Sequence, residues 1–248
     1  MKTISFANQK GGSGKTSTTR AVATWLHYNT DLKIIVIDLD FQQTSKNGRD
    51  RDIEILADLR QSNPRHPKVM FFDEQELIKP IYPVYGIQNI ANNKKTFIDL
   101  YERESKNYDL CFIDVAGSIK DKSIDAILPY INYMFIPTDV DFGTIQSSIE
   151  FATAIKSLFD NGGLPLLKDM RFFFHKYTVS KNKSAFEPVA EALTEVTSIP
   201  FFENQIKDAN EMKMDNTTFH YIKGSLSADH YLYNFCMEIM DILENKYK

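Results

Sequence analysis

Short, nearly continuous apolar segments recur along the chain and alternate with longer amphipathic segments. Five apolar segments predict strands that are buried on both faces. They are Thr3–Ala7, Lys33–Ile37, Leu110–Ile113, Tyr133–Ile136 and Met170–Phe174. Buried strands separated by helices indicate crossover connections within a parallel sheet. The pattern therefore predicts a doubly wound α/β fold, with a mainly parallel sheet and helices on both faces.

Three amphipathic helices are predicted from apolar residues spaced three and four apart. The first begins near Gly14, the second covers Thr144–Phe159, and the last runs from about Ala228 to Glu244. The polar face of the last helix is acidic, which favours packing on the core over membrane targeting. The stretch Gln43–Tyr108 contains four prolines and predicts only short or weakly marked elements. No repeat or linker divides the chain, so residues 1–248 predict a single domain.

Composition and charge narrow the class of protein. The chain has 248 residues, 43% of them hydrophobic, and a formal charge of −4, which excludes a globally basic nucleic-acid binder but not a local basic patch. Its two cysteines form no CxxC pair, so an iron–sulfur carrier is disfavoured and a reducing cytoplasm is expected. No apolar run approaches the roughly 20 residues that span a bilayer, and no signal-peptide pattern opens the chain. We therefore expect a cytoplasmic protein that does not bind membranes.

The sequence between the first predicted strand and the first predicted helix is rich in glycine and ends in Gly-Lys-Thr. Glycines lack a Cβ atom, so the backbone N–H groups can approach phosphate oxygens, and the following helix start adds unpaired N–H groups and a positive dipole end. The lysine is expected along the β- and γ-phosphates, and the threonine hydroxyl on Mg²⁺. The predicted phosphate-binding residues are Gly11, Gly12, Ser13, Gly14, Lys15, Thr16 and Ser17.

A second lysine, Lys10, precedes this loop, and the segment KGGSGKT resembles the deviant Walker A box of the ParA/MinD family of P-loop ATPases. The resemblance implies a P-loop NTPase fold of the SIMIBI class, with ATP and Mg²⁺ as cofactors. It also implies that Lys10 reaches across a dimer interface, so that two ATP molecules lie between two subunits. A cation supplied by the partner would act on the γ-phosphate as an arginine finger does, and would couple hydrolysis to dimerisation.

Aspartates follow two of the predicted strands, at the edge where parallel sheets bind ligands. A single aspartate of this kind is more often a turn or helix cap, but three beside a phosphate loop favour a site. The segment DLDFQ resembles the family's DxDPQ, which implies that Asp38 supports the magnesium shell and that Asp40 positions or activates water. Asp114 resembles the Walker B aspartate, and Phe41 replaces the usual proline. These departures favour hydrolysis that is slow or depends on a partner.

The nucleotide base is predicted from the last strands. His175-Lys176-Tyr177-Thr178 lacks the aspartate of a guanine-reading NKxD motif, so ATP is favoured, with His175 either a base contact or a plain strand end. The segment Thr197–Pro200 resembles the family's last strand, and Pro200 and Phe201 then become adenine contacts by position.

The resemblance implies a homodimer on ATP binding, a separate ATPase-stimulating adaptor protein, and possible non-specific DNA binding near the nucleoid. The expected task is segregation, maintenance or transfer of a plasmid or mobile element, or the positioning of another large cargo. Two alternatives stay open: a dethiobiotin-synthetase-like enzyme on the same scaffold, or a nucleotide-binding regulator with negligible turnover. The DNA candidates could equally form a solvated surface. They are Arg49, Arg51, Arg60, Arg65 and Lys68, or Lys176, Lys181 and Lys183.

Overall fold

A seven-stranded sheet forms the centre of the molecule, with the order β3-β2-β4-β1-β5-β6-β7. The computed structural model describes residues 1–115, 122–177, 179–207 and 230–244, and every strand pair among them is parallel. The strands are β1 Lys2–Phe6, β2 Ile34–Asp38, β3 Val84–Gly86, β4 Leu110–Asp114, β5 Tyr133–Thr138, β6 Asp169–Tyr177 and β7 Ile206–Lys207. The predicted doubly wound α/β fold is confirmed, and all five predicted strands are present.

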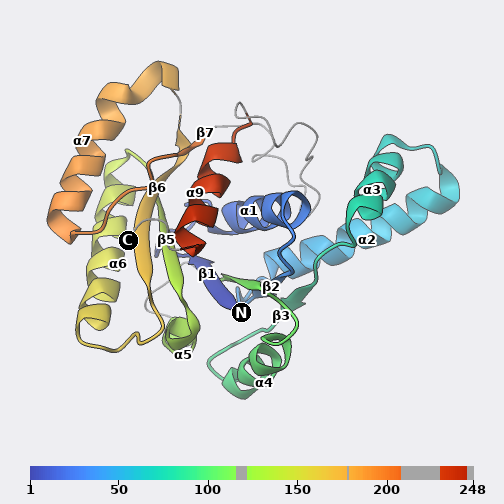
Figure 1. The fold of residues 1–248 in the computed structure, drawn as a ribbon, viewed down its shortest axis with the longest axis horizontal. Helices are drawn as coiled ribbons and strands as arrows, with labels where there is room; N and C mark the ends of the chain where they lie inside the picture. The colour runs from blue at the N-terminus through green and yellow to red at the C-terminus, as the bar shows by residue number, and fades with distance from the viewer. Residues whose placement is uncertain (116–121, 178, 208–229, 245–248) are drawn as a thin grey trace.

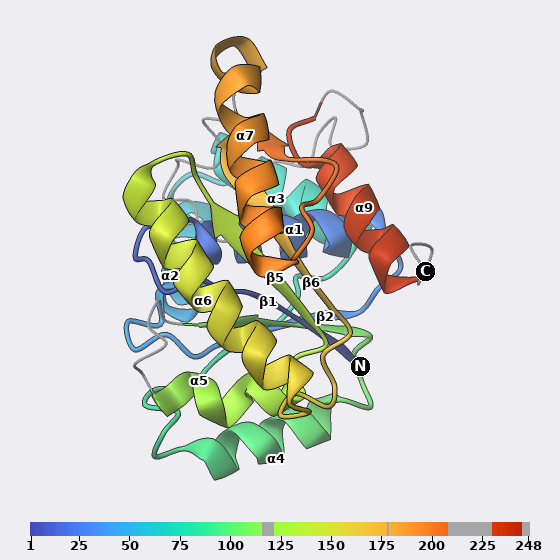
Figure 2. The same ribbon diagram turned by 90° about the vertical axis from the view of Figure 1, so that its left-hand side faces the viewer.

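Helices cover both faces of this sheet (Figures 1 and 2). They are α1 Lys15–Asn29, α2 Thr44–Ser62, α3 Pro67–Ile78, α4 Lys94–Glu104, α5 Lys122–Ile127, α6 Phe142–Asp160, α7 Val179–Thr197 and α9 Tyr233–Leu243, with a short 3-10 turn at Leu128–Tyr130. Alternate residues of one strand point to opposite faces. Thus Ile35 and Ile37 join the core that includes residues of α4, α6 and α7, whereas Ile34 and Val36 join the core under α1 and α9.

The stretch Gln43–Tyr108 is more regular than predicted. It contains the 19-residue helix α2, the 12-residue helix α3 and the 11-residue helix α4. Helices α2 and α3 form a hairpin that projects from the body, at the right of Figure 1, and pack on each other through Leu56, Val69 and Phe72. The sequence signal was weak because these two helices bury only a small apolar cluster between them, which needs only a narrow apolar stripe.

The C-terminal part differs from the prediction in two places. The expected strand Thr197–Pro200 is wrong: α7 ends at Thr197, and the last strand among the described residues is β7 at Ile206–Lys207. The final helix α9 begins at Tyr233 rather than near Ala228, a residue outside the described part. Its apolar face is buried on the sheet, as expected for a helix that packs on the core. No helix in the described ranges is long and apolar enough to cross a bilayer.

Candidate functional site

The glycine-rich loop joins the end of β1 to the start of α1 at the carboxyl edge of the sheet. Gly12 and Gly14 have φ angles of 75° and 86°, a region that favours glycine. A Cβ atom on Gly14 would lie 2.4 Å from Nε2 of His175, so a larger residue there requires the imidazole ring to move. No side chain caps the first turn of α1. Its N–H groups therefore remain available to an anion, as a phosphate cradle requires.

Lys15 points into this loop. Its side chain is nearly buried, and its ammonium donates to the backbone carbonyl of Lys10 at 2.9 Å and lies 3.5 Å from Oγ of Ser13. Burial lowers the pKa of Lys15, while the carboxylates of Asp114 and Asp40 oppose that change. The side chain of Lys15 thus lies inside the loop, where a lysine that binds phosphates is expected.

Two buried carboxylates lie side by side behind the loop. Asp38 and Asp114 occupy facing positions at the ends of β2 and β4, and both are fully buried. The hydroxyl of Thr16 donates to Oδ1 of Asp114 at 3.1 Å. Burial, together with the charge of Asp38, raises the pKa of Asp114 to about 7. A cation at this point would offset two crowded negative charges.

The residues present fit magnesium. Thr16 and Asp114 offer hard oxygen ligands, and Mg²⁺ commonly uses one or two protein ligands together with substrate phosphates and water. The described residues contain no group of three or more His, Cys, Asp or Glu side chains that could hold a metal. The predicted metal residues Thr16, Asp38 and Asp114 lie together, because Thr16 donates to Asp114 and Asp114 faces Asp38, and their binding of magnesium stays a prediction.

Asp38 and Asp40 organise the start of α2. Asp38 accepts backbone N–H groups from Asp40 at 3.1 Å, Ser45 at 2.7 Å and Lys46 at 3.0 Å. Burial raises the pKa of Asp38, and these hydrogen bonds work against that change. The half-buried carboxylate of Asp40 accepts from the N–H of Gln42 at 2.9 Å. Asp38 thus lies opposite Asp114, and both Asp38 and Asp40 accept backbone N–H groups before and at the start of α2. Their roles at the magnesium shell and at the attacking water stay predictions.

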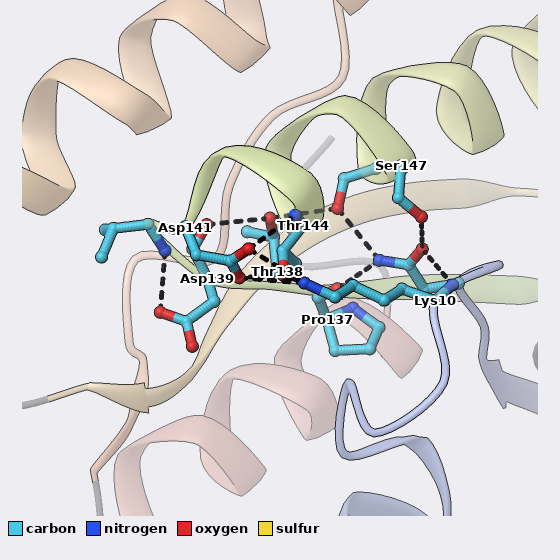
Figure 3. A network of polar contacts seen from close by, with 10 residues as sticks. Lys10, Pro137, Thr138, Asp139, Asp141, Thr144 and Ser147 are labelled. Carbon is cyan, nitrogen blue, oxygen red and sulfur yellow. Dashed lines mark hydrogen bonds and ion pairs between the residues drawn. The ribbon is translucent and has the colours of Figure 1, made fainter.

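Lys10 lies along the rim of the loop, toward the start of α6 (Figure 3). Its ammonium pairs with the carboxylate of Asp141 at 2.9 Å and donates to Oγ1 of Thr144 at 2.5 Å. Asp141 is the N-cap of α6 and accepts from the backbone N–H of Thr144. Hydrogen bonds from Thr144 and Lys10 lower the pKa of Asp141 to about 2. The ammonium of Lys10 is therefore held within its own subunit by an acidic helix cap.

Sequence reasoning missed several residues of this rim. Asn8 donates to the carbonyl of Pro137 at 2.7 Å and to Oγ of Ser148 at 2.9 Å, which ties the loop to β5 and α6. Asp141 has a signal that could have found it: Asp139-Val140-Asp141-Phe142 repeats the D-x-D-F string of residues 38–41 after another strand.

The predicted base contacts lie in different places. His175 is buried against Gly14, with its Nδ1 3.4 Å from Oγ1 of Thr18, so it supports the phosphate loop. The carbonyl of Pro200 accepts from the N–H of Phe172, and the ring of Phe201 stacks on the ring of Phe172. Pro200 lines a small cavity with Asp169, the first residue of β6, so the structure does not bring it to the phosphate loop. The adenine contacts of Pro200 and Phe201 stay a prediction.

Two of the residues predicted to bind DNA make contacts within the chain. Arg49 is 4% exposed and lies over the ring of Tyr82, so its prediction as a surface cation is wrong. Arg60 pairs with Asp73 and Glu76 across the α2–α3 hairpin. The side chains of Lys176, Lys181 and Lys183 lie outside the described part of the structure.

Comparison with known proteins gives the class. A family model described as an AAA domain matches residues 1–164. The chain therefore belongs to this AAA-domain family, and its resemblance to the ParA/MinD P-loop ATPases is confirmed.

Individual relatives agree with this class. An uncharacterised protein of Methanocaldococcus jannaschii, MJECL24, is 26% identical over 203 residues, covering 72% of this chain and 74% of that protein. Among solved structures, MinD in the MinC:MinD cell division complex of Aquifex aeolicus matches with a TM-score of 0.66 and 14% identity, over 97% of this chain and 96% of that one. A McdA–ATP complex from Cyanothece gives 0.63 and 18%, over 99% and 96%. The pNOB8 ParA bound to nonspecific DNA gives 0.61 and 17%, over 98% and 99%. Each structural match shows a shared fold.

Proposed function

We propose that the chain is an ATPase that dimerises when it binds Mg²⁺-ATP and separates after hydrolysis to ADP and phosphate. One observation carries the proposal: two lysines of one phosphate loop point in different directions. Lys15 is nearly buried inside the loop, whereas the side chain of Lys10 is 37% exposed on the rim beside α6. A second cation on an accessible rim is suited to a triphosphate held by another subunit.

The other residues take roles that follow from their positions. The loop backbone and Lys15 would bind the phosphates, while Thr16 and Asp114 would hold Mg²⁺, which supplies charge neutralisation at the phosphates when bound. Asp40 lies close enough to Lys15 for their charges to interact, and we assign it to orienting the attacking water. Single-turnover hydrolysis by Asp40→Ala tests this assignment, and a wild-type rate in the variant removes Asp40 from the mechanism.

The biological task that best suits such a switch is the segregation or positioning of a plasmid, mobile element or other large cargo. The named relatives support this direction, because they include a cell division complex and a ParA on nonspecific DNA. We further propose a separate adaptor protein that stimulates hydrolysis, non-specific DNA as a second partner, and a cytoplasmic, nucleoid-associated location. DNA binding that falls steeply between low and high salt would support the DNA partner.

The decisive experiment measures molar mass by light scattering with ATP, with ADP and without nucleotide. We expect the wild-type protein to be a dimer with ATP and a monomer with ADP or without nucleotide. We expect Lys10→Ala to be a monomer under all three conditions. Lys156→Ala is the matched control, since Lys156 is also a lysine in an ion pair with an aspartate, at the far end of α6. Hydrolysis without any change of mass would instead favour a transfer enzyme on the same scaffold. Dimerisation without hydrolysis would favour a regulator.

A further inference from the structure

A buried arginine lies near the carboxylate pair, next to Ser45 at the start of α2. Arg20 projects from α1 and is 7% exposed. Its Nε donates to Oγ of Ser45 at 3.1 Å, and its Nη2 is buried without a hydrogen-bond partner among the described residues. A buried cation of this kind is costly unless nearby negative charge compensates it. That charge comes from Asp114, whose carboxylate lies within electrostatic range of Arg20.

Ser45 connects the arginine to the carboxylate. The hydroxyl of Ser45, which is 1% exposed, lies 2.8 Å from Oδ2 of Asp114. Arginine can only donate hydrogen bonds, so the oxygen of Ser45 must accept from Arg20. Its single hydrogen is then left for Asp114. The other carboxylate oxygen, Oδ1, is the one that accepts from Thr16.

The two carboxylate oxygens of Asp114 thus have different hydrogen-bond partners. Oδ2 is held from behind by Ser45, which is itself fixed because its backbone N–H donates to Asp38 at 2.7 Å. Oδ1 faces Thr16, the other candidate metal residue. We propose that Arg20 and Ser45 are positioning residues that lock the Asp114 carboxylate in the orientation needed for magnesium. This inference rests on the proposed Mg²⁺-ATP function and deepens it, since it adds two residues that act on magnesium through Asp114.

The test measures binding of a fluorescent ATP analogue, first in EDTA and then as Mg²⁺ is added. Loss of an outer hydrogen bond to a metal-ligating carboxylate weakens metal affinity by about tenfold or more. We expect Ser45→Ala and Arg20→Met to raise the half-saturating Mg²⁺ concentration by that amount and to leave binding in EDTA unchanged. Ser45→Thr and Arg20→Lys keep the hydroxyl and the charge, and we expect them to recover most of the wild-type response.

Two controls come from the exposed part of α2. Ser62→Ala and Arg60→Met remove a hydroxyl and a guanidinium that have no contact with Asp114, and they should leave the Mg²⁺ curve unchanged. Wild-type Mg²⁺ curves for Ser45→Ala and Arg20→Met would overturn the inference. So would equal weakening in EDTA and in Mg²⁺, because that result indicates a general structural role. Failure of the wild-type protein to bind the analogue at all would refute the proposed function instead.

Discussion

The ion pair between Lys10 and Asp141 allows a sharp test of the dimer switch. If Lys10 acts on a partner's nucleotide, it must first leave Asp141, which holds it at 2.9 Å. Asp141→Asn removes the charge but keeps a good helix N-cap, because asparagine and aspartate cap about equally well. The substitution therefore releases Lys10 with little effect on α6. We expect the ATP-bound dimer to become tighter.

The magnitude follows from the exposure of the pair. The side chains of Lys10 and Asp141 are 37% and 56% exposed, so water and salt screen their attraction. Such a pair contributes about 0.5–1 kcal/mol. Two pairs must break in each symmetric dimer, so the wild-type protein loses about 1–2 kcal/mol on dimerisation. Removing this cost should lower the dimer dissociation constant about five- to thirtyfold.

Sedimentation velocity with a nonhydrolysable ATP analogue measures this constant. Asp160→Asn is the matched control, since Asp160 forms a comparable exposed pair with Lys156, 2.9 Å apart, at the other end of the same helix. The double variant Lys10→Ala/Asp141→Asn should stay monomeric, as Lys10→Ala does, because Asp141→Asn strengthens the dimer only through the lysine that it releases. An unchanged or larger dissociation constant for Asp141→Asn would mean that Lys10 does not move from Asp141 to the nucleotide, and the reasoning would fail.

Three further predictions concern the loop, the carboxylates and the last helix. Gly14→Ala should destabilise the fold by about 1–3 kcal/mol in urea denaturation, because the φ of Gly14 is 86° and His175 occupies the space of a Cβ atom. The double variant Gly14→Ala/His175→Ala should recover part of the lost stability. If it recovers none, His175 is not the group that the new methyl group contacts. The pKa of Asp114 is about 7 in the folded chain and about 3.9 when unfolded, so the folded state holds the extra proton between these values and the free energy of unfolding without metal should fall by about 3 kcal/mol as pH rises from 4 to 7. Asp114→Asn should abolish most of that slope, and an equal slope in the variant would exclude Asp114 as its source. Buried Glu238 accepts from the N–H groups of Glu203 and Asn204 at 2.9 and 2.8 Å and pairs with Arg171 at 3.5 Å, so Glu238→Ala should cost about 3 kcal/mol or more in thermal unfolding. Glu195→Ala, at an exposed position of α7, should cost little in the same experiment.

The sheet could be predicted from the sequence because each central strand is buried on both faces. Segments such as Ile34–Ile37 are then apolar at every position, and the signal does not depend on neighbours. The short edge strands β3 and β7, with three and two residues, lack such a run. Which residues of these segments pair with the sheet depends on where the preceding helix ends. The strand was therefore predicted at Thr197–Pro200, whereas α7 continues to Thr197 and β7 lies at Ile206–Lys207.

The candidate site likewise contains some residues that could be predicted from the sequence and others that could not. The phosphate loop could be predicted because its function depends on local backbone geometry within a few consecutive residues. The D-x-D-F string marks Asp141, but the contacts of Asp141 with Lys10 and of Ser45 with Asp114 could not be assigned, because these partners lie 131 and 69 positions away along the chain. A lone serine at a helix start or a lone aspartate before a helix is ordinarily a cap, and only the partners give either residue another meaning.

By itself, the amino-acid sequence determined the parallel α/β architecture, the phosphate loop with its two lysines, and the aspartates at the strand ends. Each of these depends on periodicity or on residues close together in the chain. Only the tertiary structure decided that Lys10 lies against Asp141, that His175 packs against Gly14, and that Ser45 lies between Arg20 and Asp114. The physical reason is that hydrogen bonds and charge pairs act over a few ångströms in space, whatever the separation of the residues along the chain.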